Sequence, residues 1–516
     1  MQLGTKADEV GGYTIDAKDG IGTATITGDV TSGSAIYVRE GELIIGGTDY
    51  HNTVTINTQG GGQHRQGDSP TMLSVAGKNS VLTIDNATVT SNVEVATTIG
   101  GADGNGSLTI QNGGKYVGSN QDYFFIGYQS YRTGSSTPLS PHVQIVHATT
   151  QGALGKANSD NTDLENRFVG EYSDGANGAE FGRGVVTVTG NSEFVATGIK
   201  EFALGHGELN ILENSSFASS SLPVLLGFSV GCTSTVNVES GSVMNINGQL
   251  HTGSYKDSKI EINVTNATLN LNNYKGSFLG LGSETTYDYV DNGSVTEVNL
   301  NEGAVMNVTE EMYVGYRANA NVNVAATATI NDSGDSRDRM IICDAGSVEN
   351  AGTIELDIVM TGGQLTAHDG AEFADITALG GTINVDGSIT VGSLTLGEVN
   401  IAAAEEVAVM TLATADEVQK AVQLVLSQNA SINATDVEGL DNAEIIIVLD
   451  NYTAGDVLDS GHQYIVGADG ETKVTIKNSA GEVVATNVDI RTVPEPATAT
   501  LSLLALAALA ARRRRK

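Results

Sequence analysis

Residues 104–114 read GNGSLTIQNGG, and this stretch decides the fold. Leu108, Thr109 and Ile110 alternate apolar and polar side chains with the period of two that is typical of a half-buried strand, and the Asn-Gly-Gly that follows suits a sharp turn. The same alternation recurs at Leu82-Thr83-Ile84, Val186-Thr187-Val188, Leu209-Asn210-Ile211, Val236-Asn237-Val238, Ile262-Asn263-Val264, Val298-Asn299-Leu300 and Val322-Asn323-Val324. We therefore expect one structural unit that repeats along the chain.

A second landmark, an aliphatic residue before glycine, follows each of these strands at a nearly constant distance. It occurs at Ile99-Gly100, Ile126-Gly127, Leu204-Gly205, Leu226-Gly227, Leu279-Gly280 and Val314-Gly315, with Thr252-Gly253 and Val169-Gly170 as weaker matches. A period of about 25 residues with three short strand-like segments predicts an all-β fold, a parallel β-helix or β-solenoid. A propeller blade needs about 40 residues, and a leucine-rich repeat needs a denser leucine pattern.

The repeats are similar to those of autotransporter passengers and related surface adhesins, most clearly at residues 104–114, and the likeness covers roughly residues 80–330. This resemblance implies a surface-exposed solenoid. An autotransporter is nevertheless a weaker alternative, because that class carries a C-terminal outer-membrane barrel of alternating strands. Here the C-terminal residues predict a basic-ended helix instead.

The chain divides into four predicted parts. Residues 1–79 are an N-terminal β segment, and residues 80–402 are the solenoid, with loop insertions near 130–182 and 283–294. Residues 403–490 are a small α+β capping module that covers the open end of the solenoid. Within it, the capping box at 414–417 precedes Val418, Ala421, Val422 and Val425 at helical spacing, which predicts a helix.

The fourth part, residues 491–516, has three segments. Pro494, Glu495 and Pro496 form an extended stretch, since proline cannot continue a helix from its interior. Residues 497–511 are uncharged and predict a short transmembrane helix of about 22 Å, less than the roughly 30 Å hydrocarbon core. Arg512, Arg513, Arg514, Arg515 and Lys516 form a basic cluster that stays on the cytoplasmic side.

These residues strongly resemble the PEP-CTERM sorting signal of Gram-negative bacteria. The resemblance implies an exosortase-type processing enzyme as partner, transient anchoring in the inner membrane through residues 497–511, and an exported product in the cell envelope, on the surface or outside the cell. The alternative is a plain tail anchor, for which the span is short. Residues 1–20 contain no apolar signal-peptide region, so either the chain begins inside a longer gene product or its start lies elsewhere.

Composition restricts the partners. The 516 residues carry a net charge of −35, and five of the 26 basic residues belong to the tail. Such an acidic body argues against nucleic acid and anionic lipid as ligands. The two cysteines, Cys232 and Cys343, are predicted to lie four coils apart, about 19 Å at ~4.8 Å per coil, and therefore to remain unpaired.

Few residues suggest chemistry at a site. Asp332, Asp335 and Asp338 in NDSGDSRD are weak candidates for a calcium ion, because solvated turn residues are the simpler explanation, and no other cofactor is indicated. His206 and His251 lie near landmark glycines and should share a face two coils apart. Polysaccharide-cleaving β-helices place acidic and basic residues together on one strand face, whereas the corresponding positions here are Thr and Asn.

We therefore expect a protein that is not an enzyme. The sequence predicts an exported bacterial surface or matrix protein with a structural or adhesive role, which binds exopolysaccharide or a host glycan. The alternative from another class is a carbohydrate-active β-helix enzyme that acts on polysaccharide.

Overall fold

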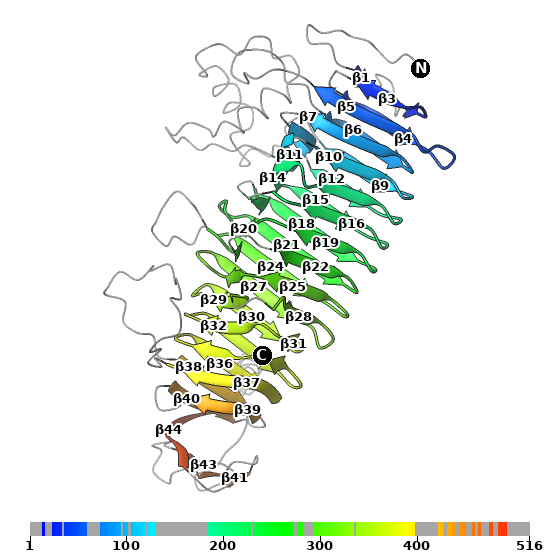
Figure 1. The fold of residues 1–516 in the computed structure, drawn as a ribbon. Coiled ribbons are helices and arrows are strands. Elements are labelled where there is room, and N and C mark those ends of the chain that lie inside the picture. Colours follow the sequence, from blue (N-terminus) through cyan, green and yellow to red (C-terminus); the bar gives the residue numbers. More distant parts are fainter. Residues whose placement is uncertain are drawn as a thin grey trace, which may run out of the picture.

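The computed structural model is a long stack of short parallel strands (Figure 1). It describes residues 13–15, 23–32, 36–58, 73–93, 96–101, 105–119, 121–128, 183–221, 223–228, 231–272, 276–282, 293–334, 337–397, 422–427, 431–438, 443–449, 457–459, 463–465, 474–477 and 483–492. In these residues the only regular elements are strands.

The strands form three parallel ladders, and each coil of the chain contributes one strand to each ladder in turn. The first ladder contains β2 (Thr23–Ile26), β4 (Ile36–Gly46), β6 (Leu73–Asp85), β9 (Gly106–Gln111), β12 (Gly184–Val188), β15 (Gly207–Ile211), β18 (Thr233–Glu239), β21 (Lys259–Thr265), β24 (Val295–Leu300), β27 (Asn319–Val324), β30 (Gly346–Asn350), β33 (Gln364–His368), β36 (Thr382–Asp386), β38 (Val422–Ser427), β40 (Ala443–Leu449) and β44 (Val483–Thr492).

The second ladder contains β3 (Val30–Ser32), β5 (Thr53–Thr58), β7 (Thr88–Val93), β10 (Lys115–Gly118), β13 (Glu193–Ala196), β16 (Ser216–Ser219), β19 (Val243–Ile246), β22 (Thr268–Asn272), β25 (Val305–Thr309), β28 (Thr329–Asp332), β31 (Thr353–Ile354), β34 (Glu372–Phe373), β37 (Ser388–Leu396) and β39 (Ser431–Glu438). The third contains β1 (Tyr13–Ile15), the first halves of β4 and β6, β8 (Ala96–Gly101), β11 (Gln121–Tyr128), β14 (Ile199–Leu204), β17 (Val224–Leu226), β20 (Leu250–Thr252), β23 (Ser277–Leu279), β26 (Glu311–Val314), β29 (Arg339–Ile342), β32 (Asp357–Met360), β35 (Ile376–Ala378) and the end of β37.

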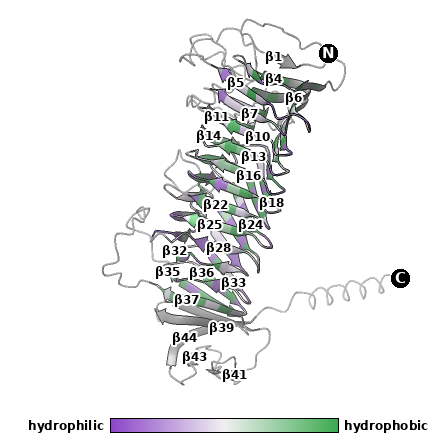
Figure 2. Cartoon of the chain, turned by 45° about the vertical axis from the view of Figure 1, so that its right-hand side comes forward, coloured by the Kyte–Doolittle hydropathy of each residue, from purple (hydrophilic) through white to green (hydrophobic). Residues whose placement is uncertain are grey.

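The predicted strand repeats are confirmed residue by residue. Leu82 lies opposite Leu108, which lies opposite Val186, and the same column continues through all eight repeats that the sequence indicates. These aliphatic side chains point into the solenoid and are buried, while the Thr or Asn between them points outward. Figure 2 shows this alternation of hydrophobic and hydrophilic residues along the strands. The parallel β-solenoid is therefore the fold.

The landmark glycines mark the corner between the third and first ladders. Ile99, Ile126, Leu204, Leu226 and Thr252 form one column at the end of the third ladder. Gly127 follows with a φ of 57°, and Gly280 occupies the equivalent place with a φ of 70°. A side chain at Gly127 would meet the carbonyl oxygen of His206, so the next coil leaves room only for glycine.

Aromatic side chains fill the middle of the solenoid. Phe194 packs against Tyr116, Phe124, Phe202 and Phe217, with ring centroids 4.9 to 6.1 Å apart, and all five rings are fully buried. Rings at such distances add to the burial of apolar area that holds stacked coils together. The few aromatic residues of this chain are thus partly concentrated in three consecutive coils.

Two columns of asparagine connect the coils on the outside. On the first ladder, the side-chain amides of Asn237, Asn263, Asn299 and Asn323 each donate to the amide oxygen of the preceding asparagine, starting from Asn210, at 2.7 to 3.1 Å. On the second ladder, Asn245, Asn270, Asn307 and Asn331 are joined in the same way at 2.6 to 2.8 Å. The outward asparagines of the sequence pattern therefore form continuous hydrogen-bonded ladders along the stack.

The structure corrects three expectations. Val169-Gly170 lies outside the described residues, and the ladder has no place for a coil there, because Ile126 pairs directly with Leu204. Val422 and Val425, predicted in a helix, lie in strand β38, whose Leu424 and Leu426 point into the core as the ladder continues past residue 402. The residues of that helix before Val422 lie outside the described residues. The coil length also falls, from 26 residues between Leu82 and Leu108 to 17 between Val348 and Leu365 and 18 between Leu365 and Ile383.

The shorter coils have a simple cause. Their strands in the second ladder, β31 and β34, are only two residues long, and the turns around them are correspondingly tight. Beyond them, the parallel order ends where β43 (Val474–Lys477) pairs antiparallel with β44; β41 (Val457–Asp459) and β42 (Gln463–Ile465) form a separate antiparallel pair.

Three long segments outside the described residues connect strands at the same corner of the solenoid. Residues 129–182 connect β11 to β12, residues 283–292 lie between β23 and β24, and residues 398–421 connect β37 to β38. In each case the pairing of the flanking strands shows that the two coils are consecutive. All three segments therefore leave the third ladder and return to the first, and two of them coincide with the predicted insertions.

Candidate functional site

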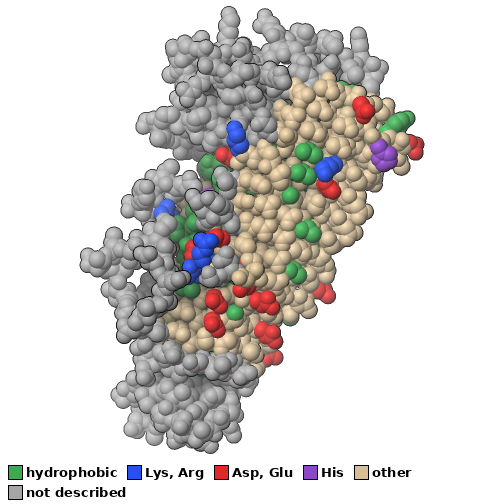
Figure 3. All heavy atoms as spheres, viewed as in Figure 1, with side chains coloured by type: hydrophobic (Ala, Val, Ile, Leu, Met, Phe, Trp, Pro, Cys, Tyr) green, Lys and Arg blue, Asp and Glu red, His purple; other side chains and the backbone are tan. Residues whose placement is uncertain are grey.

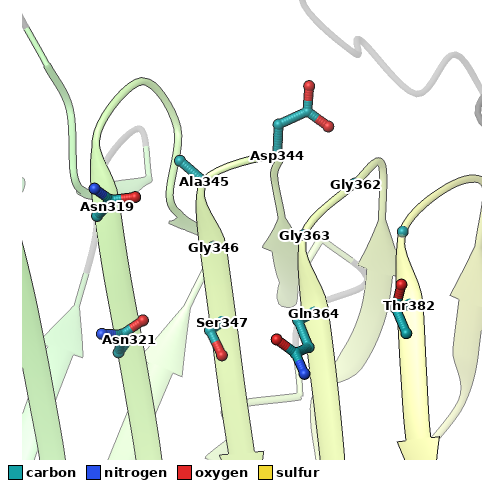
Figure 4. A pocket seen from close by; sticks show the side chains of 11 residues that line it. Asn319, Asn321, Asp344, Ala345, Gly346, Ser347, Gly362, Gly363, Gln364 and Thr382 are labelled. Carbon is teal, nitrogen blue, oxygen red and sulfur yellow. The ribbon is translucent and has the colours of Figure 1, made fainter. Parts of the chain in front are cut away.

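A groove crosses the outer face of the first ladder where the coils become short (Figure 4). It has a volume of about 480 Å³ and is lined by the beginnings of β27, β30, β33 and β36 and by the turns that precede them. Each strand contributes one outward polar side chain, in the order Asn321, Ser347, Gln364 and Thr382.

The groove exists because one outward column loses its side chains. In earlier coils this column carries Lys259, Val295 and Asn319, which lie opposite one another. In the next three coils the equivalent positions are Ala345, Gly362 and Gly380. Together with Ala345, the glycines of these turns that line the groove, Gly362, Gly363 and Gly381, therefore form a floor with almost no side chains.

The polar row beside this floor is not used for internal hydrogen bonding. Within the described chain, the side chains of Asn321, Ser347, Gln364 and Thr382 make no hydrogen bond, and Ser347 and Thr382 are half-buried. One position further along β27, Asn323 donates to Asn299 at 2.8 Å. Neighbouring columns of similar residues thus differ: one completes the asparagine ladder, and the other presents its polar groups to the groove.

Among the described residues that line the groove, none carries a positive charge. Its one ionisable side chain among the described residues is Asp344, which is exposed at the rim, with its carboxylate close to Gly362 (Figure 4). Glu297 precedes Asn321 in the same column, and Glu349 lies two residues after Ser347. Figure 3 shows acidic side chains gathered toward this end of the visible face. The surroundings therefore disfavour anionic ligands.

The calcium candidates serve as turn caps where they are described. The carboxylate of Asp338 is buried and accepts hydrogen bonds from the backbone N–H of Glu310 at 2.6 Å and from the hydroxyl of Ser333. Asp332 accepts from the backbone N–H of Gly334 at 2.6 Å. Asp335 lies outside the described residues. Within the described ranges, no three His, Cys, Asp or Glu side chains come together as metal ligands, so calcium at NDSGDSRD stays a prediction.

The two histidines lie two coils apart as expected, but in different settings. His206 follows the corner after β14, and burial, followed by the charge of Arg183, lowers its pKa. His251 points outward from β20, where burial lowers its pKa to about 4 and its ring contacts Phe278 edge-on at 5.5 Å. His251 is therefore part of a packed surface.

The outer face of the third ladder carries a column that sequence reasoning missed. Its members lie two residues before each landmark glycine, or before Cys343 in the last of these coils: Phe125, Ala203, Leu225, His251, Phe278, Tyr313 and Ile341. Phe278 and Tyr313 stack at 4.7 Å, and burial together with Glu311 raises the pKa of Tyr313. The signal was present at a fixed offset from the landmark glycines, but only the register shows that these residues share one face.

Cys232 and Cys343 are both free, which confirms that they are not bridged. Cys343 follows β29, which is four coils beyond β17, the strand that precedes Cys232. Burial raises the pKa of the Cys343 thiol to about 12. Neither cysteine therefore links the coils covalently.

The sorting residues 494–496, the apolar run 497–511 and the basic cluster 512–516 lie outside the described residues. In the part that the structure describes, no helix is long and apolar enough to cross a membrane. No curated protein matches the chain significantly. Residues 492–516 match the family model of the PEP-CTERM protein-sorting motif. The chain is therefore a β-solenoid that carries an exosortase sorting signal, the mark of an exported protein sorted to the cell envelope.

Proposed function

We propose that this protein is a structural or adhesive component of the bacterial cell surface, displayed or released after exosortase removes its C-terminal tail. The observation that carries the proposal is the outer surface of the solenoid. Positions that cleaving β-helices use for acid and base groups are occupied here by asparagines that bond to one another over five consecutive coils.

Such a surface suits binding and display. The asparagine ladders and the buried aliphatic columns couple each coil to the next, which favours a stiff rod that projects a repeated polar pattern. The −35 net charge keeps such a rod soluble and lets it engage cationic or neutral partners. In this proposal, the body binds exopolysaccharide or a host glycan, and residues 497–511 hold it in the inner membrane only until processing.

The proposal is tested in the bacterium that encodes the protein. The gene is deleted and complemented either with the full chain or with a chain that lacks residues 492–516, and adhesion between cells and to a glycan-coated surface is measured. We expect the full chain alone to restore both adhesion and localisation at the envelope. Normal adhesion of the deletion strain would overturn the adhesive role.

The alternative of a carbohydrate-active enzyme is tested with the purified mature protein. Neutral and acidic polysaccharides are incubated with it, and new reducing ends and unsaturated sugar products are measured over time. We expect neither product. A product that accumulates in proportion to protein concentration would replace the adhesive proposal with an enzymatic one.

A further inference from the structure

We infer that the groove on the first ladder binds a neutral polysaccharide chain, laid along the axis of the solenoid across β27, β30, β33 and β36. This inference deepens the proposed surface function by naming the ligand class and the residues that contact it. The binding residues are Asn321, Ser347, Gln364 and Thr382, with Ala345, Gly362, Gly363 and Gly381 as the floor.

The shape of the groove favours a linear ligand. Neighbouring strands in a sheet are ~4.8 Å apart, so the four polar side chains span about 14 Å along the solenoid axis. They lie in one row across four parallel strands, and the floor beside them has no large side chain (Figure 4). A polymer whose hydroxyl groups recur along its length would meet one polar partner in each coil.

The chemistry of the row matches hydroxyl groups. Each amide of Asn321 and Gln364 offers two N–H donors and an oxygen acceptor, and the hydroxyls of Ser347 and Thr382 donate as well as accept. A sugar hydroxyl also does both, so every contact is able to form without a change of protonation. These side chains have no hydrogen bond to another part of the described chain, which leaves them available to a ligand.

Charge and backbone pairing argue against the other ligand classes. With Asp344 at the rim and Glu297 and Glu349 nearby, a polyanion would be repelled. A calcium ion needs six to eight oxygen ligands, and the groove offers one carboxylate. An extended peptide would gain affinity by adding to a sheet edge, but the groove lies on the face of a ladder whose backbone groups are already paired.

The test measures binding of hexasaccharides by calorimetry to the mature protein purified from the envelope. The probes are neutral glucose hexamers with β-1,4, α-1,4 and β-1,3 linkages, together with hexagalacturonate as a charged control of equal length. We expect saturable binding of at least one neutral hexamer and none of hexagalacturonate. Absence of binding by all three neutral hexamers, or equal binding of hexagalacturonate, would overturn the inference.

Variants localise the binding. The double substitution Asn321→Ala with Gln364→Ala removes two side chains that carry no internal hydrogen bond, and we expect affinity to fall about tenfold. Ala345→Leu fills the floor and should weaken binding at least as much. Thr235→Ala is the matched control, because Thr235 occupies the same outward column on β18 outside the groove. Unchanged affinity in both groove variants, with intact circular dichroism, would exclude the groove as the site.

The adhesion assay keeps the two proposals apart. Cells that express the Asn321→Ala, Gln364→Ala protein report whether adhesion uses this groove, while the deletion strain reports whether the protein is adhesive at all. Calorimetry on the purified protein decides the groove by itself, whatever the cells do.

Discussion

Replacing Gly127 with alanine should separate two coils of the solenoid. Gly127 has a φ of 57°, a conformation that costs an L-residue about 1–2 kcal/mol. A methyl group there would overlap the carbonyl oxygen of His206 and lie too close to its carbonyl carbon. These atoms belong to backbone, so the coil that contains His206 must move.

The movement would break the hydrogen bonds that join these coils at the corner. The backbone N–H of His206 donates to the oxygen of Gly127 at 2.7 Å, and that of Gly184 donates to the oxygen of His206 at 3.0 Å. Two such bonds contribute roughly 2 kcal/mol together. With the conformational term, Gly127→Ala should lower the free energy of unfolding by about 3–4 kcal/mol.

Gly113 provides a matched control. Its φ of 77° is also positive, but an added side chain would meet nothing within 4 Å. Gly113→Ala should therefore cost only the conformational term, about 1–2 kcal/mol. The difference between the two variants isolates the crowding between coils.

Hydrogen exchange measured by mass spectrometry is the suitable assay, because repeat proteins often unfold in parts and a single midpoint is then hard to interpret. Peptides that cover β12 and β15 should lose about 150- to 900-fold in protection in Gly127→Ala and about 5- to 30-fold in Gly113→Ala. Equal losses in the two variants would show that the corner is not crowded. Unchanged protection in both would refute the assignment of these glycines to left-handed corners.

Three further predictions follow from other parts of the molecule. Asn263→Asp removes the N–H donor to Asn237 and should lower the free energy of unfolding by about 1–2 kcal/mol at pH 7. The loss should be smaller near pH 3, because a protonated carboxyl group donates a hydrogen bond again. Equal urea midpoints for the variant and the wild type at pH 7 would contradict the asparagine ladder. The pKa of His251 is lowered to about 4 in the folded protein, so between pH 6.5 and 4 the unfolded chain binds more protons than the folded chain. The wild type should therefore lose stability as the pH is lowered from 6.5 to 4, and His251→Phe should lose less. Parallel pH profiles of the thermal midpoint for the two proteins would exclude this role. Mass spectrometry of envelope protein should find a C-terminus near Pro494-Glu495-Pro496; intact Arg512 to Lys516 on surface-exposed protein would contradict processing.

The sequence alone determined the class of fold, because its two landmarks are local. The alternation of Leu108, Thr109 and Ile110 is a property of one strand, and the glycine of Ile126-Gly127 is required by one corner. Both signals survive without knowledge of any neighbour. The sorting tail was readable for the same reason, since its three segments are contiguous.

Other features depend on register between coils, which only the tertiary structure decided. The assignment of Val169-Gly170 as a repeat landmark was wrong, because periodicity cannot tell a degenerate repeat from an insertion. The pairing of Ile126 with Leu204 can. Val422 and Val425 fit helical spacing, but the neighbouring strand β36 pairs with this segment and buries Val422, Leu424 and Leu426 at every second position. At this segment, strand pairing in the ladder determined the structure, and the local helical spacing did not.

The groove is the feature that the sequence could least predict. Ala345, Gly362, Gly363 and Gly381 are ordinary small residues at turns, and Asn321, Ser347, Gln364 and Thr382 are ordinary polar residues in strands. They line one groove only because the pairing of consecutive coils places these positions opposite one another. A cavity is a relation between side chains in different coils, and register, which sets that relation, is fixed by the packing of the whole stack.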